Sequence, residues 1–158
     1  MAQRRIELRM SSYVNINAFF AFLEATGIPA LEHWNVALWT VRPALEFPGI
    51  ARDEVVGDAL DFSAHAAAAW VEFVGPEMYQ WTDEYAHGPL LGAPGEGGPL
   101  WMGKHGYCKE RWKLWRMRLG DIAGSLNVDD GIRGVARQAE ERMKAIEAEA
   151  EARNLGGS

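Results

Sequence analysis

The fold of this chain is decided by the segment GYCKERWKLWRMRLG, residues 106–120, which places two tryptophans and five cations in one stretch of an otherwise acidic protein. Its apolar residues recur at helical spacing and predict one continuous face turned to a core: Cys108, Trp112, Trp115, Leu119 and Ile122. Leu114 and Met117 lie on the opposite side, where a membrane-surface helix or a calmodulin-target helix carries its charges. We therefore expect a central strut, held by apolar packing and by ion pairs with acidic neighbours.

The charge of the chain is unevenly distributed, with a net charge of −6 over 158 residues. Residues 24–84 hold eleven acids and two bases, or −9, whereas residues 104–118 hold six bases and one acid, or +5. Because nucleic-acid-binding modules carry a net basic domain, we expect no nucleic acid partner. The apolar run of residues 18–23 is too short for a membrane span or a secretory signal, so we expect no membrane partner. An organelle transit peptide remains the alternative for the arginine-containing N-terminus.

The composition fits one domain with an aromatic core, because 48% of the residues are hydrophobic and seven of them are tryptophans. Cys108 is the single cysteine, which excludes an intramolecular disulfide and a cysteine-based zinc cluster. A chain without disulfides suits a reducing compartment, and we expect a cytoplasmic location. We predict a flexible N-terminal segment over 1–11, a single helical domain over 12–153 and a flexible tail over 154–158.

Hydrophobic periodicity indicates helices throughout and no strand alternation. Besides the helix of the 106–120 segment, the predicted helices span Val14–Ala25, Leu31–Phe47, Asp53–Val74 and Asp129–Arg153, with a short piece over Glu77–Tyr85. Gly75 and Pro76 are expected to end the third of these helices. Residues 87–106 are rich in glycine and proline and predict a long irregular loop, anchored at its far end by Leu100 and Trp101. The fold class is all-α, a compact bundle of about five to six helices.

Each predicted helix has an expected buried face. In the first it is Ile16, Phe19, Phe20 and Leu23; in the second Leu31, Trp34, Leu38, Val41 and Leu45; in the third Val55, Ala59, Phe62, Ala66, Trp70 and Phe73; in the last Ile132, Val135, Ala139, Met143 and Ile146.

Two polar stripes are candidates for chemistry. On the second helix, Trp39, Arg42 and Glu46 share a face on which the guanidinium could orient a polar ligand. The alternative is a surface ion pair between Arg42 and Glu46, four residues apart. On the third helix, Asp61 and His65 have the spacing of an acid–base pair, and the alternative is a solvated helix face.

We name Arg42, Glu46, Asp61 and His65 as candidate catalytic residues, and Trp39, Trp70 and Trp101 as candidate ligand-binding residues. The four histidines are scattered and form no metal-binding spacing, so we expect neither a metal nor a cofactor.

Several segments together resemble a family of small, mostly fungal proteins defined by a domain of unknown function. These segments are Tyr13-Val14-Asn15-Ile16-Asn17-Ala18-Phe19, Leu38-Trp39-Thr40-Val41-Arg42-Pro43-Ala44-Leu45-Glu46, Gly98-Pro99-Leu100-Trp101 and Lys109-Glu110-Arg111-Trp112-Lys113-Leu114-Trp115. The resemblance covers residues 12–146. It implies a helical, intracellular fungal protein and a family some members of which accompany specialised-metabolite genes, and it supplies no catalytic residues.

Two functions from different classes remain open. The first and favoured one is a non-enzymatic helical binding or scaffold domain, because no complete catalytic constellation is visible. The second is a cofactor-independent cyclase or isomerase that holds an apolar substrate in an aromatic pocket under the 87–106 loop. The partner is accordingly an apolar small molecule or a protein, and the sequence leaves the oligomeric state open.

Overall fold

The computed structural model describes the backbone of residues 2–48, 54–85 and 95–156, and side chains within 11–48, 63–85 and 95–156. Five α-helices make up the fold over these ranges: α1 (Ala2–Ala25), α2 (Trp34–Leu45), α3 (Glu54–Gln80), α4 (Lys109–Gly124) and α5 (Asp130–Gly156). A 3₁₀ turn, Pro29–Leu31, precedes α2. A single bridge between Glu84 and Gly106 is the only β pairing in the described residues. The predicted all-α bundle is confirmed.

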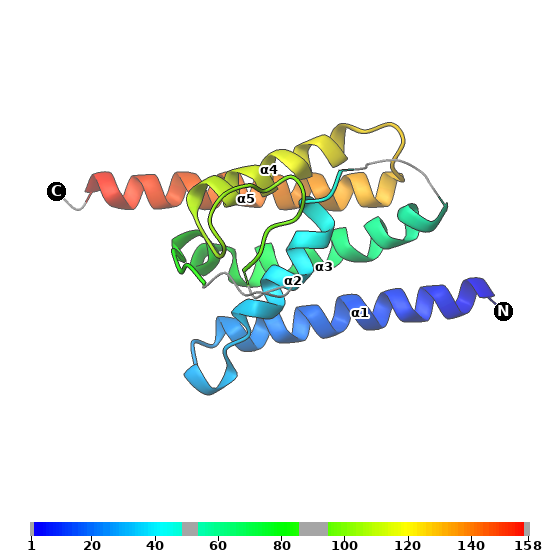
Figure 1. Ribbon diagram of the computed structural model, residues 1–158, viewed down its shortest axis with the longest axis horizontal. Coiled ribbons are helices and arrows are strands. Elements are labelled where there is room, and N and C mark those ends of the chain that lie inside the picture. Colours follow the sequence, from blue (N-terminus) through cyan, green and yellow to red (C-terminus); the bar gives the residue numbers. More distant parts are fainter. Residues whose placement is uncertain (1, 49–53, 86–94, 157–158) are drawn as a thin grey trace.

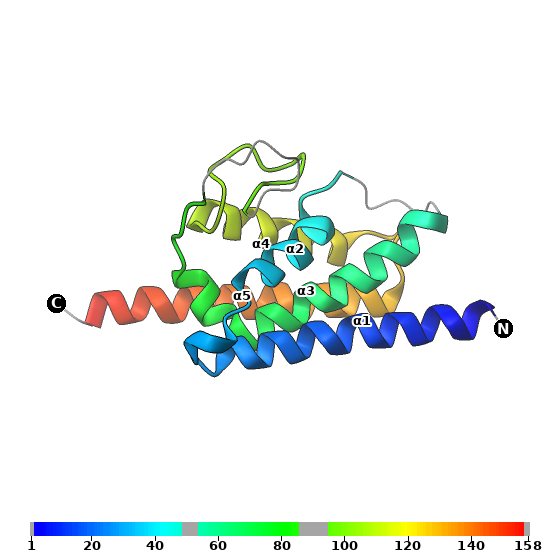
Figure 2. The same ribbon diagram turned by 60° about the horizontal axis from the view of Figure 1, so that its bottom comes forward.

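Helix α3 is the centre of the bundle and packs against α1, α2 and α5 (Figure 1). Helices α4 and α5 form a hairpin, and α2 crosses between α3 and α4. The loop of residues 95–106 covers the ends of α2 and α4 on the side away from α1 (Figure 2). No helix in the described part of the chain is long and apolar enough to cross a membrane.

Four of the five residues predicted for the buried face of α4, Trp112, Trp115, Leu119 and Ile122, are buried in the core, whereas Cys108 is only partly buried. The helix begins after Cys108, whose sulfur accepts a hydrogen bond from the backbone N–H of Arg111 and so serves as the N-cap. Met117, on the opposite side, is exposed. Helix α4 is therefore buried on its aromatic side and exposed to solvent on the opposite side.

Helix α3 continues through Gly75 and Pro76 to Gln80, so the predicted stop is wrong. Proline lacks the N–H that would bond one turn back, but the turns around it are fixed by the core contacts of Val74 and Met78. A Cβ atom at Gly75 would lie 2.6 Å from the Ile146 side chain, so glycine also permits the close approach of α5. Tertiary packing therefore outweighs the local tendency of Gly75 and Pro76 to end the helix.

The face predicted for α1 is wrong in part, because Phe20 and Leu23 are partly buried and Phe20 packs against the core. Ile16 and Phe19 are largely exposed, while Asn17 and Ala21 are buried. Residues 13–23 are apolar around most of the helix, so periodicity did not identify the side that packs on α3. Phe73 of α3 is likewise exposed, and the neighbouring Val74 takes its place in the core.

The start of α1 differs most from its predicted position. Helix α1 begins at Ala2, twelve residues before the predicted start, and α2 and α5 lie within three residues of theirs. On α5 the predicted residues Ile132, Ala139, Met143 and Ile146 are buried and Val135 is partly so. The division into one domain with flexible ends stays a prediction.

Candidate functional site

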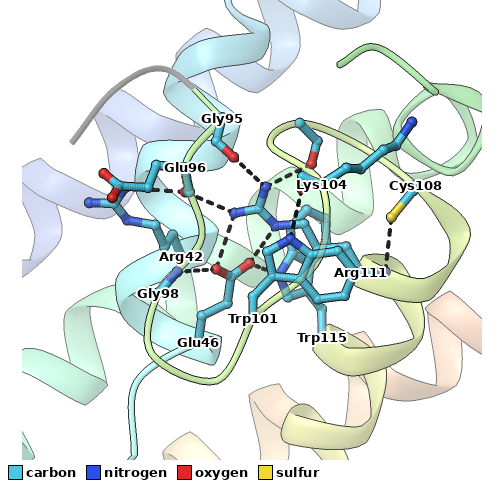
Figure 3. Close-up of polar contacts among 11 residues, drawn as sticks. Arg42, Glu46, Gly95, Glu96, Gly98, Trp101, Lys104, Cys108, Arg111 and Trp115 are labelled. Atoms are coloured by element: carbon cyan, nitrogen blue, oxygen red, sulfur yellow. Dashed lines mark hydrogen bonds and ion pairs between the residues drawn. The ribbon is translucent and has the colours of Figure 1, made fainter. Parts of the chain in front are cut away.

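A buried ion pair between Glu46 and Arg111 joins α2, α4 and the 95–106 loop (Figure 3). Both side chains are 0% exposed. Arg111 Nε donates to Glu46 Oε1 at 2.7 Å and Nη2 donates to Oε2 at 3.1 Å, so the carboxylate and guanidinium meet in parallel. Such two-point pairs are among the strongest polar contacts in proteins. They stabilise a fold only when every other polar atom of the pair is also satisfied.

The remaining donors of Arg111 are directed to the loop backbone. Nη1 donates to the carbonyls of Gly95 at 2.8 Å and Gly106 at 2.7 Å, and Nη2 donates to the carbonyl of Glu96 at 3.1 Å. With the two bonds to Glu46, each of the five N–H groups of the guanidinium has an acceptor. Arg111 thereby ties both ends of the 95–106 loop to the helices.

The carboxylate of Glu46 is saturated in the same way. Besides Arg111, its Oε1 accepts from the indole Nε1 of Trp115 at 2.6 Å, and its Oε2 accepts from the backbone N–H of Gly98 at 2.7 Å. The backbone carbonyl of Glu46 accepts from the N–H of Leu100 at 3.0 Å. We name Glu46, Arg111 and Trp115 the buried clamp. Its hydrogen-bonding capacity is used within the protein, which suits a structural role rather than substrate binding.

Two tryptophan rings lie beside the guanidinium. The Arg111 carbon Cζ lies 5.7 Å from the ring centroid of Trp101 and 5.5 Å from that of Trp115. Trp101 is held in turn by a bond from its Nε1 to the carbonyl of Lys104 at 2.8 Å. These contacts exclude water from the cation and strengthen the ion pair. Of the two predicted anchors of the loop, Trp101 packs over Arg111, whereas the Leu100 side chain is 37% exposed and Leu100 is held through its backbone N–H.

The residues predicted as a ligand stripe on α2 have separate surroundings. Arg42, partly exposed, donates through Nη1 to the Glu96 carbonyl at 3.2 Å and lies 4.0 Å from the Glu96 carboxylate. Glu46 binds Arg111, so the alternative of a surface pair between Arg42 and Glu46 is wrong, because that carboxylate faces the interior. Trp39 is 50% exposed on the outer side of α2.

The other candidate tryptophan on a helix, Trp70, is fully buried and belongs to a second polar network. Its Nε1 donates to the side-chain oxygen of Asn17 at 3.0 Å, and the same oxygen accepts from the Thr40 hydroxyl at 2.6 Å. Asn17 also donates to the Tyr13 carbonyl at 3.0 Å. This network connects α1, α2 and α3, and it explains why an asparagine occupies the buried face of α1.

The predicted acid–base pair on α3 lies at the limit of the described side chains. His65 is partly buried, whereas the side chain of Asp61 lies outside the described residues. Catalytic roles for Arg42, Glu46, Asp61 and His65, and ligand binding by the three tryptophans, therefore stay predictions. In the described ranges, no three histidine, cysteine or carboxylate side chains are grouped to hold a metal ion.

Two tyrosines form an aromatic cluster near the start of α2. The Tyr107 hydroxyl donates to the Trp34 carbonyl at 2.6 Å. The Tyr85 ring stacks on the Trp34 ring, with 4.1 Å between the two ring centroids. Burial raises the pKa of Tyr107 well above its usual value, and burial with the charge of Asp83 raises the pKa of Tyr85 to about 12. Both phenols are therefore neutral at physiological pH and act as packing groups.

Sequence reasoning missed Arg111 as the partner of Glu46. One signal was available: Arg111 lies four residues before Trp115, beside the apolar face of α4, where a cation needs a buried acidic partner. In the sequence, Glu46 lies on a polar stripe, and the basic residue nearest to it on the same helix is Arg42. A contact between residues 65 positions apart has no local signature.

One family model matches the chain. It is described as "Protein of unknown function (DUF3632)" and covers residues 2–119, from the start of α1 to within α4. The matched region includes Glu46, Arg111 and Trp115 and ends before α5. No curated protein and no solved structure matches the sequence significantly.

Proposed function

We propose that this chain, which belongs to the DUF3632 family of proteins of unknown function, is a non-enzymatic helical binding domain. The observation that supports this is the buried clamp, in which every donor of Arg111 and both oxygens of Glu46 are engaged. A loop held at residues 95, 96, 98, 100 and 106 forms a fixed surface. A catalytic lid, in contrast, has to open and close.

The surface that the clamp supports is apolar on the outside. Trp39, Pro43 and Phe47 follow one another at intervals of four residues along the exposed side of α2 and its end. Leu100 joins them, because its N–H bonds to the carbonyl of Glu46. We name these four residues the α2–loop face.

The composition of the α2–loop face resembles that of a protein-binding hot spot. An exposed tryptophan at the centre of a contact often contributes more than 2 kcal/mol to binding. Arg42 and Glu96 lie beside it as a partly exposed ion pair and provide a polar rim. The loop approaches closely here, since a Cβ at Gly98 would lie 2.7 Å from the Glu46 carbonyl oxygen and 3.0 Å from the Phe47 ring.

We place the protein in a reducing intracellular compartment, and the resemblance of its motifs to a mostly fungal family supports a fungal source. The single cysteine is consistent with the first inference, because its thiol is used as a helix cap rather than in a disulfide. The second candidate, a cyclase or isomerase with an apolar substrate, depends on a mobile lid, and the clamp disfavours it.

Selection from a random peptide display library tests the proposal. The full chain is expected to enrich peptides with apolar anchors, and Trp39→Ala is expected to weaken their binding about 30-fold or more. Met117→Ala is the matched control, because Met117 is 54% exposed on the far side of α4. Equal binding by wild type and Trp39→Ala, or an absence of selected peptides, would refute the proposal. Stabilisation by an apolar small molecule that Trp39→Ala leaves unchanged would favour the enzyme alternative.

A further inference from the structure

The outer side of α2 carries a row of hydrogen-bond donors. Asn35, Trp39 and Arg42 follow one another at intervals of four and three residues, so their side chains are neighbours on one side of the helix. The ends of this row lie about 10 Å apart, at 1.5 Å per residue. Trp39 also belongs to the α2–loop face, so the row borders the proposed binding surface.

Burial of Glu46 removes a carboxylate from this row. Glu46 lies on the same stripe, four residues after Arg42, but its side chain is 0% exposed and is bound by Arg111. In Figure 3 the two side chains point in different directions, Glu46 toward Arg111 and Arg42 toward Glu96. The exposed part of the stripe is therefore left with donors and without the acceptor that follows them in the sequence.

Most N–H groups of the row have no acceptor among the described residues. Arg42 donates from Nη1 to the Glu96 carbonyl, whereas a guanidinium has five N–H groups. The indole N–H of Trp39, a residue that is 50% exposed, has no acceptor in the same ranges. Asn35 accepts the backbone N–H of Val36 through Oδ1, so the group it leaves for other contacts is its NH2, a donor.

Glu96 is an internal carboxylate that competes for Arg42. Its Oε2 lies 4.0 Å from Arg42 Nη1, which is beyond hydrogen-bonding distance, and the two side chains are partly exposed. An ion pair of this kind stabilises a protein by about 1 kcal/mol or less. The guanidinium is therefore available to a second carboxylate that approaches from solvent.

We propose that the α2–loop face binds a peptide segment in which an acidic side chain stands beside an apolar anchor. This inference rests on the proposed binding function and names the chemistry of its partner. The anchor packs against Trp39 and Phe47, while the carboxylate accepts from the Arg42 guanidinium and the Trp39 indole N–H. Arginine binds a carboxylate at two points, and the charge strengthens each hydrogen bond. A basic segment would instead meet the like charge of Arg42.

The Arg42 side chain is held in position without a ligand. Its bond to the Glu96 carbonyl fixes one end of the guanidinium, and the same carbonyl accepts from Arg111 of the buried clamp. The neighbouring Val41 and the next-turn Leu45 are buried and anchor α2 in the core. A side chain that is already ordered loses less conformational entropy on binding. Arg42 is therefore a preformed receptor for one carboxylate.

Paired peptide display libraries test the class of partner. Both libraries are selected on the full chain, one encoding Asp and Glu and the other encoding Asn and Gln in their place. Peptides from the acidic library are expected to bind more tightly. Replacing the selected acid by its amide is expected to weaken binding about 10-fold, as measured by fluorescence anisotropy of labelled synthetic peptides.

Variants of the chain identify the group that binds the acid. Arg42→Gln is expected to weaken binding of the acidic peptide about 10-fold and to change that of its amide analogue less than about 2-fold, because both changes remove the same interaction. Glu96→Gln removes the competing carboxylate and is expected to tighten binding of the acidic peptide about 3-fold. Arg137→Gln is the matched control, since it removes the same charge from an exposed position of α5.

The results distinguish failure of this inference from failure of the proposed function. Peptides that depend on Trp39 but keep their affinity after the acid-to-amide change, or bind Arg42→Gln as well as wild type, would refute the acidic partner and leave the binding function intact. An equal loss of affinity in Arg42→Gln and Arg137→Gln would also overturn the inference, because it would reflect net charge alone. If neither library yields a peptide that depends on Trp39, the binding function fails and the acidic partner fails with it.

Discussion

Replacing Glu46 by glutamine should strongly destabilise the protein, although the two side chains have nearly the same shape. The variant leaves the fully buried Arg111 without its counterion. An amide also has one acceptor oxygen, so its NH2 group faces either Arg111 Nη2 and Gly98 N–H or Arg111 Nε and Trp115 Nε1. Removing one partner of a buried ion pair lowers the free energy of unfolding by about 3–5 kcal/mol. That is a large part of the 5–15 kcal/mol typical of a domain.

Chemical unfolding in guanidinium chloride, followed by tryptophan fluorescence and circular dichroism, measures this change. Arg116→Met is the matched control on the same helix, because Arg116 pairs with Glu147 at 2.9 Å while both side chains are partly exposed. Its effect should be about 1 kcal/mol or less. If Glu46→Gln does not fold, the double variant with Glu46→Met and Arg111→Met provides the readout, since removing both charges should be less damaging than the two single effects combined. A loss below about 1 kcal/mol for Glu46→Gln, or one equal to the control, would refute the reasoning.

Three further predictions concern backbone, buried polar groups and pH. Gly106→Ala should lower the free energy of unfolding by about 2–4 kcal/mol, because φ is +126° and the new Cβ would lie 2.0 Å from the backbone oxygen of Asp83. Gly134→Ala, at a helical position with open space around it, should raise the free energy of unfolding by about 0.5–1 kcal/mol. Denaturant titration of both variants compares the two effects. Asn17→Leu leaves the buried indole N–H of Trp70 without its acceptor and should lower the free energy of unfolding by about 1–3 kcal/mol, whereas unchanged stability would contradict the network as described. The pKa of Tyr85 is raised to about 12 in the fold, so its contribution to stability is complete below pH 10 and is lost as pH rises toward 12; Tyr85→Phe should flatten the decline of the melting temperature over that interval.

Local chemistry made much of the fold predictable. The apolar stripe of α4 identified the face that packs in the core, because Trp112, Trp115, Leu119 and Ile122 recur at a spacing that only a helix brings together. The glycines and prolines of the loop likewise excluded regular structure where the described residues 95–106 form none beyond one bridge. These features are decided within a few residues of sequence, so sequence periodicity reports them.

The candidate site was less predictable, and Glu46 shows why. Its helix and its position beside the core stripe were evident, but its partner was not, because Arg111 reaches it only when α2 and α4 pack together. Ile16 and Phe19 were wrongly assigned to the buried face of α1 for a related reason. A helix that is apolar on several sides can bury any of them, and the hydrogen bonds from Thr40 and Trp70 to Asn17 select one.

The sequence by itself thus determined the helices, the aromatic face of the strut and the irregular loop, since each depends on the spacing of neighbouring residues. Tertiary structure alone decided that Arg111 neutralises Glu46, that α3 continues through Pro76, and that Phe19 faces outward. These outcomes depend on contacts between residues far apart in the chain. Removing one partner of a buried ion pair costs several kcal/mol, which exceeds the fraction of a kcal/mol by which the helix propensities of most residues other than glycine and proline differ.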